Sequence, residues 1–237
     1  MAERLDKVLA SQNYGSRREI AALAKQGRIT VNGQAVKNPA QKVEPEQDRI
    51  TVDGETVSFQ RYVYYMLHKP AGVLSAARDS RAQTVVDLLP QSMRRRNLFP
   101  AGRLDKDTEG LLLLTDDGDF AHRMLSPKKH IFKEYHAVLD KPISAGDVVA
   151  FAEGLELSDM TCLPATVRVL EDGETPLVSI AICEGKFHQV KRMFAARGCT
   201  VTYLKRVRIG GLWLDETLKK GAARPLTEAE RNKIFAE

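Results

Sequence analysis

The chain has 237 residues, of which 43% are hydrophobic and 28% are charged, a composition typical of a folded globular protein. Its formal net charge is +5 at pH 7 and its pI is near 9.1, which is compatible with a polyanionic partner but does not establish one. No stretch reaches the apolar length of a membrane span and the N-terminus is too charged for a secretory signal, so we expect a cytoplasmic protein without a membrane partner.

The N-terminal part of the chain predicts a small module of two helices and two tight turns. A short helix is expected over residues 4–11. The S-x-x-E spacing of Ser16–Glu19 is that of a capping box, which predicts a second helix that ends near Gly27. Asn32-Gly33 between alternating strand formers predicts a β-hairpin, and ITVDGETV at residues 50–57 predicts another turn. We therefore expect a domain over residues 1–60, a size that can fold alone.

Charge is segregated within this module. Residues 1–42 carry eight basic and three acidic side chains, whereas residues 43–60 carry one basic and five acidic side chains. Arg17 and Arg18 lie at a helix start, where positive charge opposes the helix dipole, and phosphate groups of a partner would offset that cost. The alternative is a basic face that is merely solvated.

From residue 61 onward, strand-like and helix-like runs are mixed without a regular β-α-β rhythm. The strand-like runs are YVYYML, GLLLLT, EYHAVL, LVSIAIC and CTVTYL, and the helix-like runs are DGDFAHRMLS and KFHQVKRMFAARG. This pattern predicts an α+β domain over residues 61–237 on a mixed, mainly antiparallel sheet. Its cysteines, Cys162, Cys183 and Cys199, have no close pair, which argues against a disulfide framework or a zinc knuckle and favours small buried side chains.

The stretch GRLDKDTEGLLLLTDDG at residues 102–118 places Asp105 just before four consecutive leucines. Periodicity alone does not distinguish a buried strand from a short core helix here, but the flanking turn residues favour a strand. Asp105 would then lie at the rim of the core, where a carboxylate can be both rigid and partly desolvated. The acidic spacing resembles the start of a calcium loop, but the later positions do not fit one, so we expect no metal site. A second alternative is a surface ion pair between Asp105 and Arg103.

The stretch EGKFHQVKRMFAARG at residues 184–198 predicts a basic helix near the core. Helical spacing turns Val190 and Phe194 inward, with Phe187 as a further candidate for that face, and leaves Lys191 at its edge. A cation at such an edge requires an anion. His188 by itself is more typical of a structural histidine than of a catalyst.

Four motifs in order, LHKPAGVL, GRLDKDTEGLLLLTDDG, KEYHAVL and EGKFHQVKRMFAARG, resemble the motif series of the RsuA/RluB-type ribosomal RNA pseudouridine synthases. The N-terminal module resembles the RNA-binding domain shared with ribosomal protein S4. Together the two resemblances cover essentially the entire chain. Within the family, HQVKRMFAA and the SPKKH stretch before KEY are most similar to the 16S small-subunit enzyme.

The resemblance implies a role for each matching residue. Asp105 matches the essential catalytic aspartate, and Arg103 the residue that fills the gap left in the RNA when the uridine is flipped out. Tyr135 in KEY is implied to stack on the flipped base and to help proton transfer. Lys191 matches the basic partner of the aspartate, where many relatives carry arginine, and would hold Asp105 ionised and oriented. RNA contacts are expected from Arg103, Arg17, Arg18, Lys25, Arg28, Lys186 and Arg192.

The implied reaction breaks the N-glycosidic bond of uridine, turns the base and joins its C5 to the sugar. No redox change or group addition occurs, so we expect no cofactor; a carboxylate in a water-poor pocket is required. We predict an isomerase that modifies uridine 516 of 16S rRNA, as a monomer acting on ribosomal RNA or on a small-subunit assembly intermediate. The alternatives are a 23S rRNA pseudouridine synthase of the same family and a non-catalytic ribosome assembly or RNA-binding factor.

Overall fold

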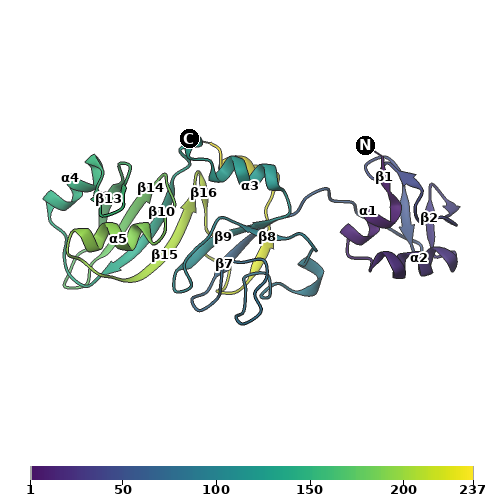
Figure 1. Ribbon diagram of the computed structural model, residues 1–237, viewed down its shortest axis with the longest axis horizontal. Helices are drawn as coiled ribbons and strands as arrows, with labels where there is room; N and C mark the ends of the chain where they lie inside the picture. Colours follow the sequence, from purple (N-terminus) through teal and green to yellow (C-terminus); the bar gives the residue numbers. More distant parts are fainter. Residues whose placement is uncertain (1, 237) are drawn as a thin grey trace. The chain divides into compact units, whose positions relative to one another are not determined.

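A computed structural model describes residues 2–236 of the chain, whose helices and strands are drawn in Figure 1. Contacts divide the chain into two compact units. The N-terminal unit runs up to Val63 and includes the later segment Pro90–Leu98, which contains the 3-10 helix Gln91–Met93; the larger unit contains the remaining residues. Pro90–Leu98 lies outside the predicted range 1–60 and is tied to that range by a hydrogen bond of 3.0 Å from Arg95 Nη1 to the Gln60 carbonyl.

The elements of the N-terminal unit follow the local signals of its sequence. The capping box is formed, because Ser16 N donates to Glu19 Oε2 at 2.7 Å and Glu19 N donates to Ser16 Oγ at 3.3 Å. Asn32 and Gly33 both have positive φ and connect two strands, which confirms the predicted hairpin. The helices are α1 (Leu5–Ser11) and α2 (Arg17–Lys25). The strands are β1 (Glu3–Arg4), β2 (Ile29–Val31), β3 (Gln34–Ala35), β4 (Lys42–Val43), β5 (Ile50–Val52) and β6 (Glu55–Thr56).

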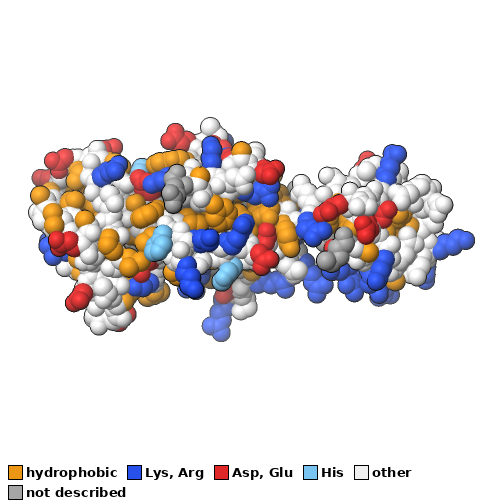
Figure 2. Space-filling view, turned by 90° about the horizontal axis from the view of Figure 1, so that it is seen from above, with side chains coloured by type: hydrophobic (Ala, Val, Ile, Leu, Met, Phe, Trp, Pro, Cys, Tyr) orange, Lys and Arg blue, Asp and Glu red, His pale blue; other side chains and the backbone are white. Residues whose placement is uncertain are grey.

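The four-stranded sheet of this unit has the order β3-β2-β5-β6, and α1 and α2 share its hydrophobic core. The most deeply buried side chains of this core include Leu5, Leu9, Ile20 and Ile29. Figure 2 shows Lys and Arg side chains along one edge of the N-terminal unit, with acidic side chains grouped apart from them. The two segments nevertheless meet on this surface, since Arg28 of the basic segment pairs with Asp53 of the acidic one.

The larger unit is built on one mixed sheet with the strand order β13-β14-β10-β15-β9-β7-β17. In addition, β16 pairs with β15 and β8 pairs with β9. The pairs are antiparallel except for β9 and β15, which confirms the predicted α+β fold on a mainly antiparallel sheet. The strands are β7 (Tyr64–Lys69), β8 (Phe99–Ala101), β9 (Glu109–Thr115), β10 (Lys133–Leu139), β13 (Thr166–Glu171), β14 (Leu177–Ile182), β15 (Val201–Ile209), β16 (Leu212–Trp213) and β17 (Ala223–Pro225).

Helices and a short hairpin complete the larger unit. The helices are α3 (Gly118–Leu125), α4 (Ala145–Glu153), α5 (Gln189–Ala196) and α6 (Glu228–Lys233), with a 3-10 turn at Pro127–Lys129. The strands β11 (Glu156–Leu157) and β12 (Met160–Thr161) pair only with each other. The three cysteines are buried free thiols, as predicted. No helix within the described part of the chain is long and apolar enough to cross a membrane.

The leucine run forms the interior strand β9, every residue of which is buried. This confirms the strand interpretation over the helical one. Leu111 and Leu113 contribute to a core cluster that also contains Met66, Phe120 and Met124, so α3 packs on one side of this strand. Because β9 is anchored by the core, the loop that precedes it is fixed at its C-terminal end.

Replacing Gly110 by alanine should destabilise the fold by about 2 kcal/mol. Gly110 has φ +106°, and a Cβ there would lie 2.1 Å from the Arg206 carbonyl oxygen of the parallel neighbour β15. Gly118, which starts α3, is the matched control, because a Cβ added there would meet no atom within 4 Å. We expect Gly118→Ala to change the free energy of unfolding by less than about 1 kcal/mol, in urea titrations followed by circular dichroism. Equal stability of the two variants would contradict the close approach at Gly110.

Candidate active site

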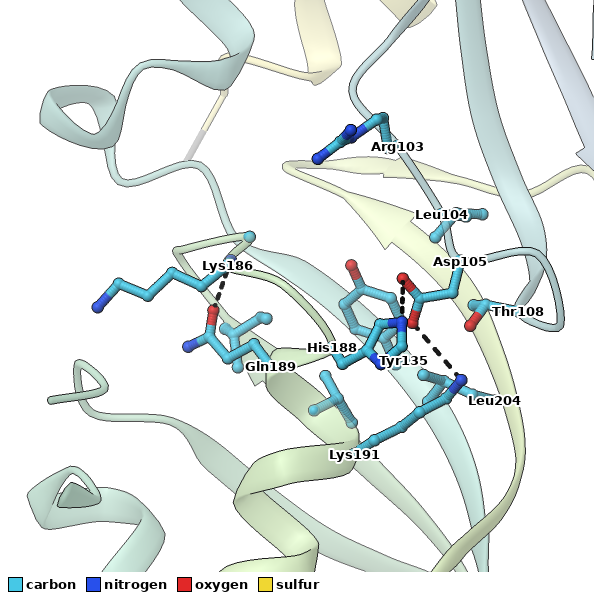
Figure 3. A pocket seen from close by; sticks show the side chains of 13 residues that line it. Arg103, Leu104, Asp105, Thr108, Tyr135, Lys186, His188, Gln189, Lys191 and Leu204 are labelled. Atoms are coloured by element: carbon cyan, nitrogen blue, oxygen red, sulfur yellow. Dashed lines mark hydrogen bonds and ion pairs between the residues drawn. The ribbon is translucent and has the colours of Figure 1, made fainter. Parts of the chain in front are cut away.

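Asp105 lies in the loop 102–108 between β8 and β9 and faces two side chains from the start of α5. Lys191 Nζ lies 3.5 Å from Asp105 Oδ2, and His188 Nε2 lies 3.6 Å from Asp105 Oδ1. The Asp105 side chain is 27% exposed, so its contacts are partly shielded from water. Figure 3 shows the carboxylate between these two groups, with the ring of Tyr135 beside them. Asp105, Tyr135 and Lys191, which are distant in sequence, thus line one pocket.

The loop that carries Asp105 is held by the segment that follows β7. Lys69 Nζ donates hydrogen bonds to the carbonyls of Pro70, Lys106 and Thr108 at 3.0, 3.2 and 2.8 Å. Ser75 Oγ donates to the Leu104 carbonyl at 2.8 Å and accepts from the Leu104 N–H at 3.0 Å. These bonds bracket Asp105 on both sides in sequence. Lys69 of the LHKPAGVL motif and Ser75, which directly follows the motif, therefore support the loop that carries Asp105.

Lys69 is fully buried, which is rare for a lysine. Burial lowers the pKa of Lys69 to about 8, and the carboxylates of Asp107, Asp105 and Glu109 act against this shift. Its ammonium group is therefore still mostly protonated at pH 7, with three carbonyl acceptors for its three N–H groups. The charge of Lys69 also adds to the positive potential beneath Asp105.

Tyr135 lies on β10 with its ring almost fully buried, next to an arginine of β15. Arg206 is 4% exposed, and its Nε donates to the Leu111 carbonyl at 2.8 Å. Arg206 Nη1 is 3.5 Å from the Tyr135 hydroxyl, and the guanidinium carbon is 5.9 Å from the centre of the Tyr135 ring. Arg206 Nη2 is buried without a hydrogen-bond partner among residues 2–236. Arg206 thus lies beside Tyr135 and brings a second buried cation close to the pocket.

Lys191 contacts two carboxylates at once. Its Nζ lies 2.6 Å from Asp107 Oδ1, closer than to Asp105, and the Asp107 side chain is largely exposed. The hydrogen bond from Lys191 lowers the pKa of Asp107. Lys191 is itself mostly buried, in agreement with the predicted position at the edge of the core face. The lysine therefore connects the loop of Asp105 to α5.

The start of α5 differs from the prediction in one respect. Val190 and Phe194 are buried as expected, but Phe187 is 70% exposed, so its assignment as a candidate core residue was wrong. The helix begins only at Gln189, because His188 has a left-handed backbone with φ 50°. Helical periodicity does not extend back to Phe187, and its side chain turns outward instead.

The remaining basic residues of the predicted site occupy different environments. Arg103 is exposed at the mouth of the pocket, and Figure 3 shows its side chain extending away from the Asp105 carboxylate. It forms no ion pair with a described residue, which excludes the alternative surface pair with Asp105. Lys186 lies 2.9 Å from Glu184 and donates to the Thr161 carbonyl at 2.7 Å. Arg192 is ion-paired with Asp159, on the turn between β11 and β12.

The predicted basic residues of the N-terminal unit lie on its surface. Arg17, Arg18 and Lys25 are exposed on α2. Arg28 is engaged with Asp53, with 2.6 Å between Nη2 and Oδ2. Three of these four cations are therefore available to a partner without loss of an ion pair to any residue within 2–236.

The arrangement provides one carboxylate among cations and an aromatic ring. A carboxylate of this kind can act as a nucleophile or as a base, and the cations can stabilise negative charge that develops on a substrate. A glycosidase places two carboxyl groups on either side of the glycosidic bond, whereas of Asp105 and Asp107 only Asp105 lines this pocket.

Three residues of the site were missed in the sequence. Lys69 interrupts the apolar run of β7 just before Pro70, and this is a signal of a buried functional cation. Arg206 lies in a basic stretch of β15, KRVR, in which only the tertiary structure distinguishes it from the partly exposed Lys205 and Arg208. His188 was interpreted as structural, but its ring faces Asp105.

Two family models match this chain. The RNA pseudouridylate synthase model matches residues 63–196, which include Asp105, Tyr135 and Lys191. The S4 domain model matches residues 3–50, within the N-terminal unit. The matched ranges contain Asp105, Tyr135, His188 and Lys191 of the site, but not Arg206, and the helix-rich part of the N-terminal unit.

Similar proteins extend the match to nearly the full chain. An uncharacterized RNA pseudouridine synthase of Bacillus subtilis is 46% identical over 229 residues, with 96% of each chain covered. The ribosomal small subunit pseudouridine synthase A of Salmonella typhimurium is 43% identical over 232 residues, with 96% of this chain and 97% of that protein covered. A crystal structure of a pseudouridylate synthase is 37% identical, has a TM-score of 0.68 and covers 98% of this chain and 99% of its own. The chain therefore belongs to the RNA pseudouridine synthases, a family of isomerases, and is one of the members that carry an N-terminal S4 domain.

Proposed function

We propose that this chain converts uridine 516 of 16S ribosomal RNA to pseudouridine. The names of its small-subunit relatives at 42–43% identity support ribosomal RNA as the substrate. The observation that carries the proposal is the pocket in which Asp105 faces Lys191 beside the buried ring of Tyr135. The enzyme would act as a monomer in the cytoplasm, on free RNA or on an assembling small subunit.

In this proposal the pocket holds the uridine after it leaves the RNA stack. Extruding a base costs stacking energy, and Arg103 at the mouth fills the space that the base leaves. Tyr135 stacks on the uracil, and Arg206 beneath it keeps the ring in place. The backbone hydrogen bonds around Asp105 then hold the carboxylate at the sugar, so little rearrangement is required when the substrate arrives.

Asp105 performs the chemical step. As a nucleophile it attacks C1′ of the ribose as the N-glycosidic bond breaks; as a base it removes a proton from the sugar. Both routes require a carboxylate that is held in one orientation. Lys191 and His188, at the start of α5, provide the contacts that orient Asp105. The detached uracil turns within the pocket and C5 bonds to C1′; on the nucleophilic route this displaces Asp105 from C1′, and on the other route Asp105 returns the proton to the sugar. The proton that leaves C5 is matched by one gained at N1 of the base, so atoms and electrons balance without a redox partner. Shielding from water keeps the detached base from being lost.

The function is tested by mapping pseudouridines in ribosomal RNA from cells that lack the protein. Loss of the modification at position 516 of 16S rRNA alone, restored by the wild-type gene but not by Asp105→Asn, is the expected result. Loss at a 23S position instead would assign the chain to the large subunit. An unchanged pseudouridine map together with a defect in subunit assembly would favour a non-catalytic assembly factor.

The basic face of the N-terminal unit should supply RNA affinity. Reversing Arg17 and Arg18 to glutamate is expected to weaken RNA binding and to flatten its dependence on salt concentration. Each phosphate contact that is lost reduces the slope of log K against log salt by roughly 0.7 to 0.9. Fluorescence anisotropy with labelled rRNA fragments at several salt concentrations measures this slope.

Arg49→Glu provides the matched control for that prediction. Arg49 is also exposed in the same unit, but it lies in the acidic segment 43–60. We expect its reversal to leave the slope nearly unchanged. If Arg17→Glu, Arg18→Glu and Arg49→Glu, each made singly, lower the salt slope equally, net charge rather than a basic RNA-binding face determines the affinity.

A further inference from the structure

Phe187 lies at the edge of the pocket and has no part in the chemistry described above. Its side chain is 70% exposed, more than any other large apolar side chain among the described residues. Its sequence neighbours Lys186 and His188 both line the pocket. Single exposed apolar side chains are common on protein surfaces, so exposure alone indicates nothing about Phe187.

The position of the Phe187 ring is fixed by the residue that follows it. The rings of Phe187 and His188 are stacked, with centroids 3.8 Å apart and an angle of 17° between their planes. His188 adopts its left-handed backbone at an energetic cost, and its side chain caps no N–H group of α5. Ser16, Ser144 and Thr227 do cap α2, α4 and α6 with their side chains. With this backbone, the ring of His188 contacts both Asp105 and the ring of Phe187.

The stack begins at the reacting carboxylate. His188 Nε2 is 3.6 Å from Asp105 Oδ1, and the His188 ring carries the Phe187 ring on one of its faces. The carboxylate, the imidazole and the phenyl ring thus form a series that leads from Asp105 out to solvent. With one face of Phe187 covered by His188, its exposed area leaves room for a third flat ring.

We propose that Phe187 is a stacking platform for the RNA base next to the uridine that enters the pocket. This inference rests on the proposed function, because it takes RNA as the substrate. Extrusion of a uridine breaks its stacking on both neighbours and leaves their flat faces open, and an aromatic side chain can replace the lost partner. Phe187 would thereby favour the extruded state and contribute to the choice of the flanking sequence.

The charges around the pocket favour an RNA strand as the occupant of this surface. Arg103 makes no hydrogen bond or ion pair with another residue of the described chain, whereas Lys186 and Lys191, which line the same pocket, are paired with carboxylates. Cations together with an exposed aromatic ring match the phosphates and bases of a single strand. An apolar segment of a protein would cover Phe187 but leave Arg103 without an anion.

The platform is tested with a short single-stranded RNA that carries the fluorescent base 2-aminopurine on one or the other side of a central uridine. Wild-type protein should quench 2-aminopurine at one of the two positions when it binds. Phe187→Leu, which keeps the apolar bulk but removes the ring, should abolish that quenching and weaken binding about tenfold. Phe187→Trp should restore both, which also shows that the pocket is intact.

Phe132→Leu is the matched control, because Phe132 is also an exposed phenylalanine, 44% accessible, outside the Asp105 pocket. It should bind and quench as the wild type does. Equal binding and quenching by Phe187→Leu and wild type would overturn the platform, as would an equal loss in Phe132→Leu. Failure of the proposed function can be distinguished from failure of the platform. If the wild type forms no pseudouridine in ribosomal RNA but still shows quenching that depends on Phe187, the platform is supported and the proposed function is wrong.

Discussion

Replacing Asp105 by asparagine is expected to abolish pseudouridine formation, with turnover reduced at least about 1000-fold. An amide has the size and shape of a carboxylate, but it is neither a nucleophile nor a base. The loop around Asp105 is held by backbone acceptors and donors rather than by the carboxylate, so the fold should persist. RNA affinity should therefore remain close to that of the wild type. Single-turnover assays at saturating enzyme, with separate binding titrations, measure both quantities.

Asp107→Asn is the matched control for this prediction. It removes the same charge two residues away, from a side chain that is 73% exposed and that shares Lys191 with Asp105. We expect it to retain most of the wild-type turnover, since Lys191 then has only Asp105 as a carboxylate partner. If Asp105→Asn kept even a tenth of wild-type turnover, the catalytic assignment would be wrong.

Replacing Lys191 by methionine should reduce turnover roughly 100-fold or more, the cost that commonly follows removal of one preorganised electrostatic partner. Methionine keeps much of the length and the apolar stem of lysine, so packing beside Val190 and Phe194 should survive. Asp105 would lose its cationic partner at 3.5 Å and retain only the contact with His188. The rate of the chemical step, measured in single-turnover experiments, should fall much more than RNA affinity.

Two further variants show whether the position of Lys191 or only its charge is required. Arg192→Met removes a neighbouring positive charge, and Lys191→Arg keeps the charge but changes the size of the side chain. Arg192 points to Asp159 rather than to Asp105, so its loss should act on RNA affinity and leave the chemical step nearly unchanged. Lys191→Arg should retain substantial activity if charge is what the site requires, and little if the space beside Asp105 is too small for a guanidinium. A larger loss of single-turnover rate in Arg192→Met than in Lys191→Met would require a different partner for Asp105.

Much of the secondary structure could be predicted because its causes are local. The Ser16–Glu19 capping box and the Asn32-Gly33 turn involve hydrogen bonds and backbone angles within a few residues, and both formed as predicted. The prediction for α5 held where the helix exists, at Val190 and Phe194, and was wrong at Phe187. No local rule placed His188 in the left-handed conformation, and the contact of its ring with Asp105 joins residues more than eighty positions apart in the chain.

By itself, the sequence determined which residues could carry chemistry and in which motifs they lie, since the motif series is read from residue types and spacing alone. Only the tertiary structure decided which other residues hold these side chains and their loops in place. Lys69 reaches the loop of Asp105 through carbonyls 37 and 39 residues away, and Arg206 meets Tyr135 across 71 residues. Such contacts depend on which strands become neighbours in the sheet, here β7 beside β9 and β10 beside β15, and strand pairing is governed by packing of the whole core rather than by nearby residues.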